Sequence, residues 1–144
     1  RMVAPHTLEF VPGHRSTVVA MPSSDLREAI TNLVTNARDA MPAAGGRCTI
    51  RLRAPTEDTA PFAELVVEDN GGGMSREAQE HLFEPFFTTK REGSGSGIGL
   101  ASVHAAVHRV GGHVHVRTQP GSGTTVVLLL PLVRASANDQ RLSG

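Results

Sequence analysis

Residues 66–74 read VVEDNGGGM, an apolar run that ends in a carboxylate, an asparagine and three glycines. The run predicts a strand, and Asp69-Asn70-Gly71 is typical of the turn that follows one. Asp69 can accept a hydrogen bond from an exocyclic amine, the group that distinguishes adenine from guanine at that edge of the base. Glycines would let the backbone approach a purine closely. By itself, the stretch is equally compatible with an ordinary strand and turn.

The segment before this strand predicts an amphipathic helix, with a start at residues 22–25, where Ser or Asp can cap it, and an end at Met41. Apolar residues at helical spacing are Leu26, Ile30, Leu33, Val34, Ala37 and Met41. The other side carries Asp25, Glu28, Asn32, Asn36 and Asp39. A solvated face is the simple interpretation, but asparagine is a mediocre helix former that such a face does not need. An amide oxygen suits magnesium, so we expect Asn36 to hold the ion and Asn32 to orient a water or a phosphate.

Residues 93–100 read GSGSGIGL and lead into a helix predicted at Ile98–Val110. Free backbone amides at the start of a helix, together with the helix dipole, form a site for phosphates. A flexible linker would have the same composition, and the strand that precedes the dinucleotide-binding fingerprint is missing here. Before this run, Leu82–Gly97 has no clear periodicity and is predicted to be a mobile loop.

The remaining segments predict strands at Thr7–Val11, Ser16–Met21, Arg47–Ala54, Phe62–Glu68, His113–Thr118 and Thr124–Leu130, with a short helix at Ser75–His81 capped by Ser75. This order predicts an α+β fold: a two-layer sandwich with a mixed, mostly antiparallel sheet of about five strands and three helices on one face. Residues 1–132 are expected to form a single domain, and residues 133–144 a frayed tail.

The composition of the chain argues against some classes of partner and site. Lys and Arg balance Asp and Glu at 14 each over 144 residues, and tyrosine and tryptophan are absent, so no nucleic-acid partner is expected. The single cysteine, Cys48, is expected to pack in the core and is compatible with a reducing cytosol. His104 and His108 have the spacing of a zinc pair on a helix, but no third ligand is apparent.

Four segments together resemble the Bergerat ATP-binding fold, the superfamily of gyrase, chaperone ATPases, histidine kinases and mismatch-repair ATPases. NARDA at 36–40, DNGGG at 69–73, FEPFFTTK at 83–90 and GSGIGL at 95–100 resemble its asparagine, first glycine, phenylalanine and second glycine boxes. GSGTT at 121–125 resembles its last turn. The phenylalanine box is similar to that of bacterial sensor histidine kinases, and the resemblance covers about residues 5–132.

The resemblance implies ATP and magnesium as cofactors, with Asn36 on the metal and Asp69 on adenine. It implies that Leu82–Gly97 is a flexible ATP lid, from which Lys90 or Arg91 reaches a phosphate. Asn32, Asn36 and Lys90 would be the catalytic residues. The nucleotide contacts would come from Asn36, Asp39, Asp69, Gly71, Gly73, Met74, Phe83, Gly95, Ser96, Gly97, Ile98, Gly99, Leu100 and Thr124.

Position 32 distinguishes the branches of the superfamily. The gyrase and chaperone branch resembles this chain but has a glutamate there as general base, whereas the Asn32 amide cannot take a proton at neutral pH. The resemblance therefore implies phosphoryl transfer to a histidine on a separate dimerisation and phosphotransfer domain of the same parent protein, with a response regulator receiver domain as an indirect partner. The chain alone is expected to be a monomer, and the parent cytoplasmic, with membrane anchoring left open. The alternatives are a hydrolysing ATPase, an anti-sigma type serine kinase and a non-catalytic binding module.

Overall fold

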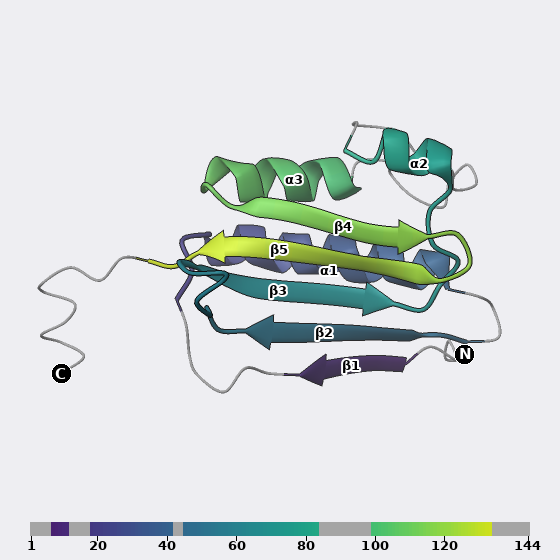
Figure 1. Cartoon of the computed structure of the whole chain (residues 1–144), viewed down its shortest axis with the longest axis horizontal. Coiled ribbons are helices and arrows are strands. Elements are labelled where there is room, and N and C mark those ends of the chain that lie inside the picture. Colours follow the sequence, from purple (N-terminus) through teal and green to yellow (C-terminus); the bar gives the residue numbers. More distant parts are fainter. Residues whose placement is uncertain (1–6, 12–17, 42–44, 84–98, 134–144) are drawn as a thin grey trace, which may run out of the picture.

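Five strands form one mixed sheet in the order β1-β2-β3-β5-β4 (Figure 1). The computed structural model describes residues 7–11, 18–41, 45–83 and 99–133. Its elements are β1 Thr7–Val11, α1 Ser23–Ala40, β2 Arg47–Arg53, β3 Phe62–Asp69, α2 Arg76–Glu80, α3 Gly99–Arg109, β4 His113–Gln119 and β5 Gly123–Pro131. β1 pairs parallel with β2, and the other neighbours are antiparallel. The predicted α+β sandwich with three helices is confirmed.

Helices α1 and α3 cover one face of the sheet and enclose an aliphatic core. Alternate residues of a strand point to opposite faces, so every second residue of β3 and β5 faces these helices. The core is built from Ala29, Leu33 and Ala37 of α1, Val103 and Val107 of α3, and Leu65, Val67, Val126 and Leu128 of the sheet. Burying one such side chain stabilises the fold by roughly 1.5–3 kcal/mol. None of the described helices lies over the other face of the sheet (Figure 1).

The predicted strand Ser16–Met21 is wrong for its described part, residues 18–21. Val19 forms only an isolated bridge with Leu132, and Val18 is 69% exposed. The β-branched composition suggested a strand, but strand propensity mostly reflects packing on a pleated surface. Here the segment only leads into α1, touching the sheet where β5 ends.

Two local expectations also fail. Pro22 occupies the N-cap of α1, and no side chain caps it; Asp25 instead forms an ion pair of 3.6 Å with Arg109 of α3. A strand with one buried face is expected to alternate buried and exposed residues, but in β2 Thr49 is 6% exposed and Leu52 is 40% exposed. Thr49 lies between β1 and β3, whereas the register of β1 with β2 ends at Arg51 and leaves Leu52 beside an open edge.

The ends of the two shorter helices are as predicted. The Ser75 hydroxyl accepts a 3.1 Å hydrogen bond from the Ala78 amide and caps α2. After α3, Gly111 adopts φ +84°, and the Gly112 amide donates back to the Val107 carbonyl over 2.9 Å. This backbone conformation favours glycine, which explains why Gly111-Gly112 ends the helix.

Candidate functional site

One row of residues crosses the sheet at the end where β3 stops. Cys48, Asp69, Thr124 and Thr118 are successive neighbours on β2, β3, β5 and β4. Their side chains lie on the face that α1 and α3 cover, because Asp69 alternates with Leu65 and Val67 of the core. The row is at the right-hand end of the sheet in Figure 1, near α2. The strand register thus carries the carboxylate to the helix-covered side.

Asp69 is half-buried and held by backbone amides. Its Oδ1 accepts a 2.8 Å hydrogen bond from the Gly71 amide, and the Thr124 amide also donates to the carboxylate. Burial raises the pKa of Asp69 above its usual value, and these two amides oppose that shift. No cation pairs with it among the residues that the structure describes. Such a carboxylate is suited to accept hydrogen bonds from a neutral donor.

The glycine turn after Asp69 lies between two other backbone segments. A side chain at Gly71 would place its Cβ 2.5 Å from the Ala40 carbonyl oxygen, and the Gly72 amide donates to that oxygen over 3.0 Å. Gly73 has φ +73° and lies against the backbone of Gln119. These glycines were predicted to admit a purine, but the packing of α1 and the β4–β5 turn already requires two of them.

A hydroxyl network joins the turn to the sheet. Thr118 Oγ1 accepts a 2.8 Å hydrogen bond from the Met74 amide, lies 2.9 Å from Thr124 Oγ1, and donates to the Gly123 carbonyl over 3.2 Å. Thr124 is buried, at 8% exposure. Of these residues, the sequence predicted Met74 and Thr124 but missed Thr118. The hairpin register could have found it, because Thr118 lies opposite Thr124.

Asn70 was quoted in the glycine motif but given no role. The side-chain Oδ1 of Asn70 accepts a 2.7 Å hydrogen bond from the Arg47 backbone amide. The backbone amide of Asn70 donates to the Arg47 carbonyl over 3.2 Å. The side chain therefore joins the glycine turn to the first residue of β2. This double contact fixes the turn relative to the row.

The α1 asparagines lie along the helix from the glycine turn. Asn32 and Asn36 are both half-buried rather than fully solvated. Ala40, whose carbonyl oxygen meets the glycine turn, follows Asn36 by four residues and lies on the same side of the helix. Asp39 is exposed and lies 3.6 Å from Arg38. The packing thus brings this side of α1 toward the Asp69 turn, while the metal and nucleotide roles of these residues stay predictions.

The remaining predicted residues divide into two groups. Phe83 stacks on His104 with ring centroids 4.3 Å apart, and His104 stacks on His108 at 5.9 Å. These histidines pack as rings, and no cluster of three metal-type ligands occurs in the described part of the chain.

Leu100 packs against the core, and Gly99 begins α3. Lys90, Arg91, Gly95, Ser96, Gly97, Ile98 and most of the predicted lid lie outside the described residues.

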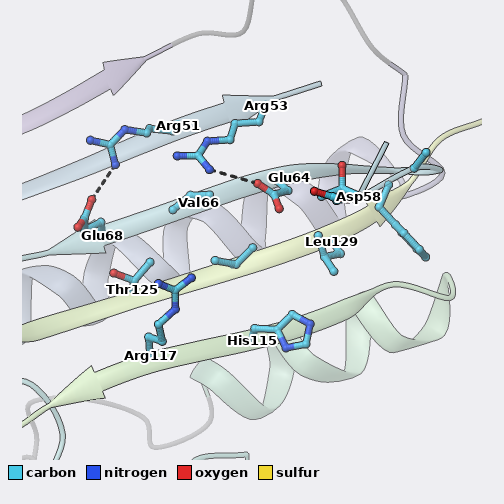
Figure 2. A pocket seen from close by; sticks show the side chains of 14 residues that line it. Arg51, Arg53, Asp58, Glu64, Val66, Glu68, His115, Arg117, Thr125 and Leu129 are labelled. Atoms are coloured by element: carbon cyan, nitrogen blue, oxygen red, sulfur yellow. Dashed lines mark hydrogen bonds and ion pairs between the residues drawn. The ribbon is translucent and has the colours of Figure 1, made fainter. Parts of the chain in front are cut away.

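A hollow of about 550 Å³ lies on the uncovered face of the sheet, away from the Asp69 row. Figure 2 shows its two ion pairs, Arg51–Glu68 at 2.7 Å and Arg53–Glu64 at 3.5 Å, with α1 and α3 behind the strands. None of the residues predicted to contact nucleotide lines it. Size alone therefore does not locate the candidate site.

A family model described as "Histidine kinase-, DNA gyrase B-, and HSP90-like ATPase" matches residues 21–134, which include the Asp69 row and both long helices. The chain belongs to this family. Within the family, sensor kinase CckA of Brucella abortus is 42% identical over 115 residues, covering 72% of this chain and 12% of that protein. The two-component sensor PprA of Pseudomonas aeruginosa is 42% identical over 119 residues, covering 80% of this chain and 13% of that protein.

The mycobacterial sensor histidine kinase MprB, a solved structure, has a TM-score of 0.69 at 32% identity, with 89% of this chain and 83% of that chain covered. This member of the histidine kinase-like ATPase family is thus an ATP-binding domain of the kind that forms the catalytic part of sensor histidine kinases. No described helix is long and apolar enough to cross a membrane.

Proposed function

We propose that the chain binds ATP with magnesium and passes the γ-phosphoryl group to a histidine on a separate dimerisation domain. The observation that carries this proposal is Asp69, a half-buried carboxylate without a cation partner among the described residues. Recognition of the adenine amine requires a hydrogen-bond acceptor that is shielded from solvent and not neutralised by a cation. The relatives whose names describe sensor kinases support the remaining steps.

Asn36 is proposed as the magnesium ligand. Its amide oxygen is a hard, neutral donor, and Asn36 lies half-buried one helical turn before the Ala40 contact. The described residues offer no cluster of three His, Cys, Asp or Glu side chains. Magnesium commonly takes one or two protein ligands and completes its shell with phosphate oxygens and water. The type of ligand that Asn36 offers therefore fits magnesium, which would neutralise phosphate charge during transfer.

Asn32 is proposed to position a group without acting as a base. An amide does not accept a proton at neutral pH, so water beside it is not activated for hydrolysis. In the proposed transfer, an imidazole nitrogen bonds to the γ-phosphorus while the bond to the β-γ bridging oxygen breaks and ADP leaves. Positioning and charge neutralisation then supply the rate acceleration. Lys90, on the predicted lid, would neutralise a phosphate oxygen.

The domain and partner assignments are part of the same proposal. Residues 1–132 are proposed as the ATP-binding domain, and the predicted tail at residues 133–144 lies, apart from Val133, outside the described residues. The acceptor histidine belongs to a dimerisation domain of the parent protein, and a receiver domain of a response regulator takes the phosphoryl group from it. The parent's catalytic part acts in the cytoplasm, and the isolated chain is a monomer.

Calorimetric titration with ATP, with and without magnesium, tests the binding half of the proposal. We expect the chain to bind ATP, and Asn36→Ala to lose most of the increment that magnesium adds, roughly tenfold in affinity. Thr31→Ala is the matched control, because its exposed hydroxyl lies on α1 and donates to the Arg27 carbonyl of the same helix over 2.9 Å. Absence of ATP binding by the wild-type chain would refute the proposal.

A transfer assay tests the other half. Labelled ATP is mixed with the chain and a dimerisation domain from a sensor kinase relative, and the labelled residue is identified. Phosphate on histidine supports the proposal. Rapid release of free phosphate without the acceptor would favour a hydrolysing ATPase, and phosphate on a serine would favour an anti-sigma type kinase.

A further inference from the structure

The Thr118 hydroxyl uses its whole hydrogen-bonding capacity on protein groups. It meets the Met74 amide at 2.8 Å, the Thr124 hydroxyl at 2.9 Å and the Gly123 carbonyl at 3.2 Å. A threonine hydroxyl has one proton to donate and two lone pairs to accept with. The three contacts therefore match its capacity, and they join the glycine turn, β4 and β5.

The proton count fixes the direction of the bond between the two threonines. The Met74 amide can only donate, and the Gly123 carbonyl can only accept. The single Thr118 hydroxyl proton is therefore used in the hydrogen bond to the Gly123 carbonyl oxygen. The contact between the hydroxyls is then satisfied only if Thr124 donates to Thr118. Once Thr124 has donated its proton, its oxygen has only lone pairs for anything that enters the site.

Thr124 is also the direct cross-strand neighbour of Asp69, on the same face of the sheet. Side chains at such positions have Cβ atoms roughly 5 Å apart, within the width of one base edge. Thr124 and Asp69 therefore offer acceptors side by side.

We propose that Thr118 is a specificity-determining positioning residue, which takes up the Thr124 proton so that Asp69 and Thr124 together select a base edge that donates hydrogen bonds. This inference rests on the proposed binding of ATP at Asp69. A 6-aminopurine presents donor protons at that edge, whereas a 6-oxopurine presents an acceptor oxygen. If an oxo group faced Asp69 and Thr124, three acceptor oxygens would meet with no proton to share between them, which disfavours the oxo base.

The test compares the affinities of ATP and inosine triphosphate by calorimetry with magnesium; inosine has an oxo group in place of the 6-amine and a proton on the adjacent ring nitrogen N1. We expect the wild-type chain to prefer ATP by roughly a hundredfold. Thr118→Val keeps the shape but frees the Thr124 proton to donate outward, so the preference should shrink roughly tenfold. Thr118→Ser restores the hydroxyl and should keep the wild-type preference within about twofold. Thr125→Val, the next residue on the opposite face of β5, is the matched control.

The ratio of the two affinities separates this role from a merely structural one. If Thr118→Val acted only through the lost contact with the Met74 amide, it would weaken both nucleotides alike and leave their ratio unchanged. An unchanged ratio alongside normal ATP binding by the wild-type chain would overturn the role of Thr118 alone. No ATP binding by the wild-type chain would overturn the proposed function and this inference together. Thermal melting checks the fold, and if Thr118→Val does not fold, Thr118→Ala is scored on the same ratio.

Discussion

Two consecutive acidic residues of β3 have opposite environments. Glu68 points to the uncovered face, where its side chain is 48% exposed and pairs with Arg51 at 2.7 Å. Asp69 points to the helix-covered face and is held by the Gly71 and Thr124 amides. One step along a strand therefore separates a solvated ion pair from a protected acceptor. The difference fits the proposed role of Asp69 as an acceptor, because a cation partner would satisfy the carboxylate permanently.

The acidic side chains on the two faces of the sheet also differ in what they contribute to stability. Exposed ion pairs are worth roughly 0–1 kcal/mol, so the pair of Glu68 with Arg51 contributes little to stability. Burial disfavours the charged form of Asp69 and raises the pKa of this carboxyl. A carboxylate in that position lowers stability in exchange for a strong acceptor, which is the pattern expected of a functional residue.

The largest effect is expected from Asp69→Asn. The variant keeps an oxygen for the Gly71 amide but turns an acceptor into a donor toward the base, so ATP affinity should fall roughly a thousandfold. Calorimetry measures the loss, and a thermal melt at neutral pH should show stability equal to or above that of the wild type. Unchanged ATP binding would show that Asp69 does not read the base.

A pH series sharpens the same comparison. Because the native pKa of Asp69 is raised, its contribution to stability is present in full at pH values below the unfolded pKa and is lost as the pH rises through the native one. The wild type should therefore gain stability relative to Asp69→Asn as the solution is acidified, while its ATP affinity falls. Denaturant unfolding at several pH values measures the difference, and an opposite slope would contradict the burial of Asp69.

The second largest effect concerns Cys48, the neighbour of Asp69 in the row. Burial, and then the charge of Asp69, raise the pKa of this thiol to about 11. At pH 8 only about one thiol in a thousand is ionised, so a thiol reagent should label the native chain at least about a hundredfold more slowly than the unfolded chain. Labelling kinetics with and without denaturant check this. Equal rates would place Cys48 outside the core.

Adjacent glycines provide the third comparison. Gly71→Ala would place a Cβ 2.5 Å from the Ala40 carbonyl oxygen, whereas Gly72→Ala meets the same atom at 3.9 Å, an ordinary contact. We expect the first change to cost about 2–3 kcal/mol of the free energy of unfolding, and the second less than about 0.5 kcal/mol. Denaturant titration of both variants measures the costs. Similar values would mean that the turn does not pack on α1 as described.

The smallest effect is expected on the uncovered face. A double-mutant cycle of Arg51→Ala and Glu68→Ala should give a coupling of about 0.5 kcal/mol. ATP affinity should stay within about twofold of wild type in all three variants, because this face is separated from the Asp69 row by the sheet. A loss of ATP binding in these variants would mean that the two faces are coupled.

The sequence predicted most elements because their patterns are local. The helical spacing from Leu26 to Met41 and the glycines at 111 and 112 gave α1 and the end of α3. The errors depend on tertiary context: the described residues 18–21 form only an isolated bridge just past β5, and Thr49 is buried by the neighbouring strand β1. Thr118 was missed because its importance comes from its partner across the hairpin. The packing of Gly71 against Ala40 likewise joins residues distant in the sequence.

β1 also has a consequence for the order in which the domain opens. It is an edge strand that pairs only with β2, and its partner residues lie about forty positions away along the chain. Such an element is among the first to exchange its amide protons with solvent through local opening. Because β2 separates β1 from Asp69, this edge can fray and re-form many times while Asp69, Thr124 and Thr118 keep their hydrogen bonds.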